Sequence, residues 1–120
     1  ISELQEPAES VEIRMNILAQ DFASYGQAVL ADLEKYAAEQ GNWFPAEENY
    51  EGVRVSFPLG EGEGWFLLRM SLHDPLMPLN IESDSHGGCR LIAQRLLDFL
   101  APYDGLDQSS LQSFIGSNED

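Results

Sequence analysis

The chain has 120 residues, of which 43% are hydrophobic and 10% aromatic, a composition typical of one folded domain rather than of a disordered segment. Six Lys or Arg residues stand against 21 Asp or Glu residues, which gives a formal net charge of −15. A surface this acidic repels both the phosphodiester backbone and anionic lipid, so neither nucleic acid nor a membrane is an expected partner.

Cysteine usage and the chain start bear on the cellular setting. The single cysteine, Cys89, cannot form an internal disulfide. The N-terminus has no signal-peptide pattern, and no apolar run approaches the roughly 20 residues of a membrane helix. We therefore expect a cytoplasmic protein. The chain begins at Ile1 rather than at a methionine, which indicates either processing or a longer parent protein.

The N-terminal third predicts a strand followed by a long helix. Residues 1–10 are polar, have no period and are expected to be an irregular lead-in. Apolar and polar residues alternate over 11–17, which is typical of a half-buried strand. Apolar residues then recur at spacings of three and four over 22–36, with Asp21 as the expected N-cap and Gly41–Asn42 as the expected end of the helix.

The middle of the chain predicts a connection and then three strands. Trp43 and Phe44 are expected to fold back onto the core, and the acidic remainder of that connection is expected to be a solvated loop. Residues 53–57 and 77–82 alternate between apolar and polar side chains, whereas 65–70 are apolar on both faces. The run 65–70 is therefore the expected central strand.

The C-terminal part predicts a second helix. Its buried stripe lies within 92–100, with Asp84 or Ser85 as the expected N-cap and Cys89 on the buried side. The tail from 101 onward has little period and is expected to wrap the surface or to be partly disordered.

The predicted order of elements is β-α-β-β-β-α. It indicates a single α+β domain in which two helices pack on one face of a mostly antiparallel, four-stranded sheet. The core is expected to span about residues 8–101, with a C-terminal tail over 102–120.

The segment "GEGEG" at residues 60–64 resembles a phosphate-binding glycine loop only superficially. Such a loop presents free backbone N–H groups at the start of a helix, close to a cation. Here two glutamates stand between the glycines and a strand follows. The pattern favours a hairpin turn.

A few side chains could in principle bind a metal or act in a hydrolase. Asp84, His86 and Cys89 lie close together in sequence, but no second cluster completes a zinc site. No signature or orienting third group supports a Cys–His nucleophile. We expect no metal site here, and a small hydrolase or metal protein built on His73, Asp74, His86 and Cys89 is kept as an alternative.

The segment "RMSLHDP" at residues 69–75 places cationic and hydroxyl side chains between two predicted strands. A strand delivers Arg69 and Ser71 to the same side, and a tight loop then exposes backbone N–H groups beside His73. Such donors suit a phosphate monoester. The alternative is that Arg69 forms a surface ion pair and the loop simply turns at Pro75.

This loop resembles that of the C-terminal domain of the α-D-phosphohexomutases, the phosphomannomutase and phosphoglucomutase superfamily. These enzymes end in a strand, a loop of the form Arg-Pro-Ser-(Gly/Asn)-Thr-(Glu/Asp)-Pro, a further strand and a last helix. The sequence keeps Arg69, Ser71, Asp74 and Pro75 in that register.

The resemblance extends over roughly residues 8–101. The stretch "NYEGVRVSF" (49–57) is similar to the "DGVRV" strand of the family, and "EGWFLLR" (63–69) to its "GW" strand. The opening "VEIRMNI" (11–17) and the first long helix also stand where the family places them.

The sequence departs from the family pattern at four positions. Met70 replaces Pro, Leu72 replaces Gly or Asn, and His73 replaces Thr. A second basic residue that is common after the loop falls at Pro78. His73 can donate a hydrogen bond where Thr would, and a bound dianion would favour its protonated form.

The resemblance implies an activity for the parent protein, the reversible movement of a phosphoryl group between the 1- and 6-hydroxyls of a hexose. The substrate phosphate would be bound by Arg69, Ser71 and His73, in a loop shaped by Leu72, Asp74 and Pro75. The nucleophilic serine, the magnesium site and the sugar-recognition loop of the family belong to other domains. We therefore expect no cofactor and no catalytic residue in this chain, magnesium in the full-length enzyme, and the remaining domains as partners.

Taken alone, the chain is expected to be inactive as an enzyme. A free-standing acidic module that binds an anion or another protein without catalysis is the alternative function. The sequence does not select among mannose, glucose and an aminosugar.

Overall fold

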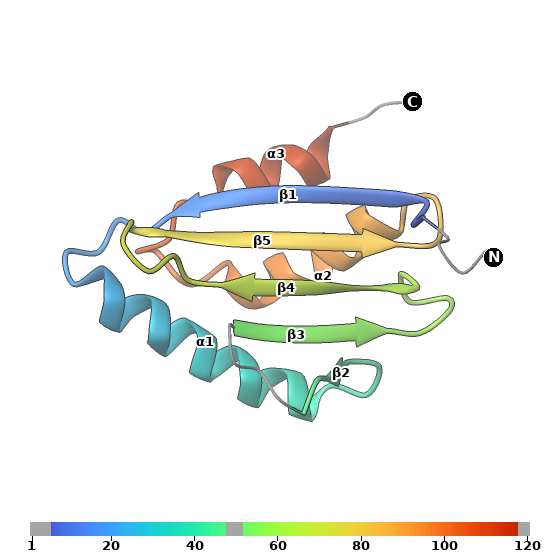
Figure 1. Cartoon of the computed structure of the whole chain (residues 1–120), viewed down its shortest axis with the longest axis horizontal. Helices are drawn as coiled ribbons and strands as arrows, with labels where there is room; N and C mark the ends of the chain where they lie inside the picture. Colours follow the sequence, from blue (N-terminus) through green and yellow to red (C-terminus); the bar gives the residue numbers. More distant parts are fainter. Residues whose placement is uncertain (1–5, 48–51, 118–120) are drawn as a thin grey trace.

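The computed structural model describes residues 6–47 and 52–117, which form five strands and three helices (Figure 1). In chain order the elements are β1 (Glu9–Asn16), α1 (Phe22–Glu39), β2 (Phe44–Pro45), β3 (Gly52–Phe57), β4 (Gly64–Arg69), β5 (Leu76–Ser83), α2 (Gly88–Leu100) and α3 (Ser109–Gly116). Parts of three predicted segments lie outside the described residues: 1–5 of the lead-in, 48–51 of the acidic connection and 118–120 of the tail.

The strands form one antiparallel sheet in the order β1-β5-β4-β3-β2 (Figure 1). β4 lies in the middle, as its apolar residues on both faces predicted. β1 comes first in the chain yet pairs along its whole length with β5. The α+β fold is therefore confirmed, and the sheet has one strand more than the predicted four, the short β2.

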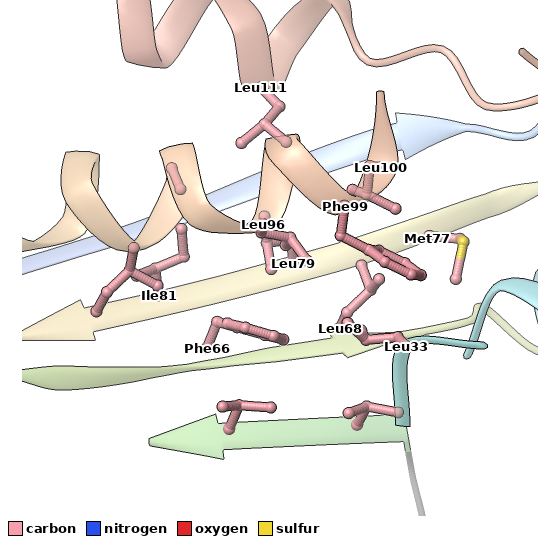
Figure 2. Packing of buried hydrophobic residues seen from close by; sticks show 14 of the residues in the cluster. Leu33, Phe66, Leu68, Met77, Leu79, Ile81, Leu96, Phe99, Leu100 and Leu111 are labelled. Carbon is pink, nitrogen blue, oxygen red and sulfur yellow. The ribbon is translucent and has the colours of Figure 1, made fainter. Parts of the chain in front are cut away.

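Alternate side chains of the strands and the buried sides of the helices form one core (Figure 2). Phe66 and Leu68 of β4 and Leu79 of β5 are fully buried, and they belong to the same cluster as Leu33 of α1 and Leu96 of α2. Burying a side chain of this size stabilises the fold by about 1.5–3 kcal/mol. The helices thus pack on one face of the sheet, as predicted. In the described part of the chain no helix covers the opposite face, which we call the open face.

α1 begins at the predicted residue. The Asp21 carboxylate accepts a hydrogen bond from the backbone N–H of Ser24 (3.3 Å) and so caps the first turn. The helix stops just before the predicted Gly41–Asn42, with Gln40 as its C-cap. Although α1 is the longest described helix at 18 residues, neither it nor any other helix in the described ranges has the length and apolarity of a bilayer span.

The start of α2 differs from the prediction. Neither Asp84 nor Ser85 caps the helix; the N-cap is Gly87, in the left-handed conformation with φ of 81°. The cap is a distant carboxylate, since Glu9 of β1 accepts hydrogen bonds from the N–H groups of Gly87 (2.8 Å) and Cys89 (3.1 Å). Glu9 is 78 residues before Gly87 in the sequence, so this cap could not be predicted from the residues next to the helix.

The C-terminal tail was predicted to wrap the surface or to be partly disordered, and in its described part it is ordered and packs against the domain. It forms α3, whose Leu111 is fully buried. The Ser110 hydroxyl donates to the carbonyl of Arg14 (2.8 Å), and the N–H of Asp107 donates to the carbonyl of Asn16 (2.8 Å). Eight residues are too few for a clear helical period, so α3 could not be predicted from the spacing of apolar residues.

The connection before β3 was predicted correctly for one aromatic residue and wrongly for its neighbour. Trp43 is buried, with its ring 5.3 Å from that of Phe57 and 6.0 Å from that of Phe66. Phe44 pairs with Ser56 and is 56% exposed on the open face. Successive residues of an extended segment point to opposite faces, so only one of the two could reach the core.

Candidate functional site

The segment predicted to bind phosphate is the loop that joins β4 to β5, at the left end of the sheet in Figure 1. The N–H of Ser71 donates to the carbonyl of Leu76 (3.0 Å), and the N–H of Leu76 donates to the carbonyl of Asp74 (2.7 Å). The carbonyl of Pro75 accepts from the N–H of Ile17, just beyond β1 (2.7 Å). These bonds close the loop tightly and fix it to the end of β1.

The outer part of the loop presents hydrogen-bond donors. Among the described residues, the backbone N–H groups of Leu72 and His73 have no hydrogen-bond partner. The Ser71 hydroxyl oxygen accepts weakly from the N–H of Asp74 (3.4 Å), which leaves the hydroxyl hydrogen free to donate. The side chains of Leu72 and His73 are both exposed, Leu72 to 87%. Adjacent N–H groups without partners are donors that an anion can use.

Arg69 ends β4 at the entrance to this loop. Arg69 is half-buried. In the described part of the chain its guanidinium makes neither an ion pair nor a hydrogen bond. The surface ion pair considered as an alternative is therefore absent from the described residues. The Arg69 fork is available for two charge-assisted hydrogen bonds to an oxyanion.

Strand alternation places Arg69 on the open face. Phe66 and Leu68 point into the core, so Trp65, Leu67 and Arg69 point the other way. On the same face, the guanidinium carbon of Arg54 lies 4.1 Å from the ring centroid of Trp65 and makes a cation–π contact.

The loop departs from the family pattern in ways that the structure explains in part. Met70 packs against α1, so closely that a Cβ added to Gly26 would collide with the Met70 sulfur. That contact anchors the loop at the position where the family pattern has a proline. Gly26, a glycine inside the predicted helix, leaves the space that Met70 fills. Pro78, which stands where a second basic residue was expected, is buried in β5.

The glycine-rich segment 60–64 is the hairpin turn between β3 and β4, as predicted. Gly62 and Glu63 have positive φ, 112° and 48°. The N–H groups of Glu61 and Glu63 both donate to the carbonyl of Pro58 (2.9 and 3.1 Å), so they are not available to an anion.

The possible metal ligands around the start of α2, which are Asp84, His86 and Cys89, do not form a cluster. Cys89 is 1% exposed, and its thiol donates to the carbonyl of Ile81 (3.6 Å), whereas Asp84 and His86 are exposed. Burial, together with the negative charges of Glu9 and Glu82, raises the pKa of Cys89 to about 12. No group of three or more potential metal ligands occurs in residues 6–47 and 52–117.

Comparison with known proteins adds one finding. Among solved structures, the fold is similar to part of a phosphoglucomutase/phosphomannomutase family protein from Burkholderia thailandensis, with a TM-score of 0.57 and 19% sequence identity. The chain shares its fold with part of that protein. The match covers 82% of this chain and 19% of that chain, so this chain spans about a fifth of the length of its structural relative. No protein-family model and no curated protein matches the sequence.

Proposed function

We propose that this chain is the substrate phosphate-binding domain of a phosphohexomutase, an enzyme that interconverts hexose 1-phosphate and hexose 6-phosphate. One observation carries the proposal: Arg69 ends β4 at the entrance to the loop that holds the N–H groups of Leu72 and His73, and none of the three has a partner in the described residues. The shared fold with a phosphoglucomutase/phosphomannomutase family protein supports the same assignment.

The chemistry of the loop suits a small dianion. The Arg69 fork matches two phosphate oxygens, and the Ser71 hydroxyl and the two N–H groups would complete the shell of donors. The exposed His73 ring would add a further donor at the outer side of the loop. Asp74, which faces solvent, is the one carboxylate within residues 69–75. In this role the loop would hold the phosphate group that is not transferred.

The magnesium ion implied by the family does not fit this loop. Magnesium requires oxygen ligands in near-octahedral geometry, whereas the groups gathered here are N–H and O–H donors with a guanidinium. We therefore assign magnesium and the nucleophilic serine to the remaining domains of the parent enzyme. On this proposal the isolated chain has no mutase activity, and its cytoplasmic location stays a prediction.

Nuclear magnetic resonance titration tests the proposal directly. The ¹⁵N-labelled chain is titrated with glucose 6-phosphate, inorganic phosphate and unphosphorylated glucose, at constant ionic strength. Both phosphates should shift the amide signals of Ser71, Leu72 and His73, with weak affinity because the rest of the cleft is missing, and glucose should shift none of them. Shifts produced equally by glucose, or shifts centred away from the loop, would overturn the assignment.

A further inference from the structure

Three of the six Lys and Arg side chains lie on strands, and all three point to the open face: Arg14 on β1, Arg54 on β3 and Arg69 on β4. The register places two of them around one residue. Arg14 of β1 pairs with Pro78 of β5. On the other side of β5, Leu68 of β4 pairs with Leu79, so the next residue of β4, Arg69, lies opposite Pro78 as well. Two arginines that are 55 residues apart in sequence thus flank the same proline.

The geometry of the sheet allows both side chains to reach one ligand. Neighbouring strands lie about 4.8 Å apart, so the backbones of Arg14 and Arg69 are separated by about 10 Å across β5. Pro78 between them has a short side chain, and although it lies on the open face it is buried, so neighbouring side chains cover it. Two extended arginine side chains that flank this position are long enough to reach one ligand.

Arg54 is excluded from this pair by its own contact. The backbone of Arg54 pairs with that of Leu67, but its guanidinium lies over the ring of Trp65. Along β4, Trp65 is two residues further than Leu67 from the β4–β5 loop. The guanidinium of Arg54 is therefore directed away from Arg69, toward the other end of β4.

Arg14 is free to change its direction. Its guanidinium lies 3.5 Å from the carboxylate of Glu12, on the side away from the loop, with side chains that are 68% and 47% exposed, so it has to turn to reach the loop. An exposed ion pair of this kind contributes little to stability, and exposed side chains change rotamer within nanoseconds. Its backbone, in contrast, is held in place, because the carbonyl of Arg14 accepts from Ser110 of α3.

We propose that Arg14 supplies a second positive charge to the phosphate bound at the β4–β5 loop, opposite Arg69. The inference rests on the proposed function and names a residue that lies outside the loop. A phosphate monoester carries close to two negative charges at neutral pH, and Arg69 alone offsets one of them. In a chain with a net charge of −15, a second nearby cation would also weaken the repulsion that an incoming dianion meets.

The test compares two substitutions that remove the same charge. Arg14→Gln and Lys35→Gln, the latter on the exposed side of α1, are titrated with inorganic phosphate at constant ionic strength, and the dissociation constant is taken from the amide shifts of residues 71–73. Arg14→Gln should weaken binding about five-fold, as expected for an exposed charge-assisted contact, and Lys35→Gln less than about two-fold. Arg14→Lys should restore part of the loss, because it returns the charge without the planar fork.

The outcomes separate this inference from the proposed function. If wild-type residues 71–73 do not respond to phosphate, the proposed function fails. If they respond and Arg14→Gln behaves like Lys35→Gln, the loop binds phosphate without Arg14 and the present inference is wrong. Equal thermal unfolding of the two variants and the wild type shows that a loss of affinity does not come from a loss of fold.

Discussion

Arg69 is half-buried at the end of β4, and in the described residues it has no acidic partner although the chain contains 21 Asp or Glu. A guanidinium without an acidic partner among the described residues can pair with an anion from outside them. Arg69 therefore carries more of the functional argument than any other single residue.

The thiol of Cys89 is predicted to be unreactive in the folded protein. The thiolate is the reactive form, and a pKa of about 12 leaves very little of it at pH 8. Iodoacetamide at pH 8 should leave Cys89 unmodified in the native chain and alkylate it in urea, as measured by intact mass. Rapid alkylation of the native chain would contradict the buried placement and would revive the alternative of cysteine-based chemistry.

At the scale of elements, the sequence predicted the long, periodic segments and missed the short ones. β1, α1 and the three strands β3, β4 and β5 stand where hydrophobic spacing placed them. β2 has two residues and α3 has eight, lengths at which neither period can be read. They exist because of tertiary contacts, such as those of Ser110 and Leu111 with the rest of the domain.

Glu9 links the first strand to α2, and its removal should destabilise the domain. Its carboxylate accepts hydrogen bonds from Gly87 and Cys89 at the N-terminus of α2, and these bonds, with that from Gly87 the larger, lower the pKa of Glu9. Glu9→Gln should lower the free energy of unfolding at pH 7 by about 1 kcal/mol, the usual value of an N-cap. Urea unfolding measures the difference, and Glu6→Gln is the matched control because it removes the same charge from an exposed site.

The same contact predicts a dependence on pH. Because the pKa of Glu9 is lower in the folded state, its contribution is complete at pH values above the unfolded pKa of about 4.5 and is lost as the pH falls through the folded value. The difference between wild type and Glu9→Gln should therefore be largest near neutrality and shrink in acid. A difference that grew on acidification would show that Glu9 does not act as a charged cap.

For the whole molecule, the charge balance predicts the response to salt. Even if each of the six Lys or Arg residues neutralised one carboxylate, fifteen of the 21 would remain. Their mutual repulsion destabilises the compact state and is screened over about 8 Å at physiological ionic strength. Added sodium chloride should therefore raise the melting temperature at pH 7, as measured by circular dichroism. An unchanged or lower melting temperature would mean that the carboxylates are better separated or paired than the composition implies.

The hydrogen-bonding and charged residues of the candidate site were predicted from the sequence, whereas the contacts that hold the loop in place were not. Strand spacing and the loop pattern pointed to Arg69, Ser71 and His73, and phosphate binding by them is still a prediction. The packing of Met70 against Gly26 depends on α1, and the placement of Arg14 beside Pro78 depends on β1 pairing with β5. These arrangements join residues far apart in sequence, so no local pattern could have shown them.

Phosphate binding at the β4–β5 loop through Arg69 is the proposal on which the assigned function depends. The most direct measurement is an amide chemical-shift titration with inorganic phosphate, in which Arg69→Ala is compared with the wild type and with Lys35→Ala as the control for charge. We expect shifts centred on residues 71–73, a loss of affinity of about ten-fold in Arg69→Ala, corresponding to about 1.4 kcal/mol, and little change in Lys35→Ala. Shifts centred elsewhere, or an affinity that Arg69→Ala leaves unchanged, would contradict it.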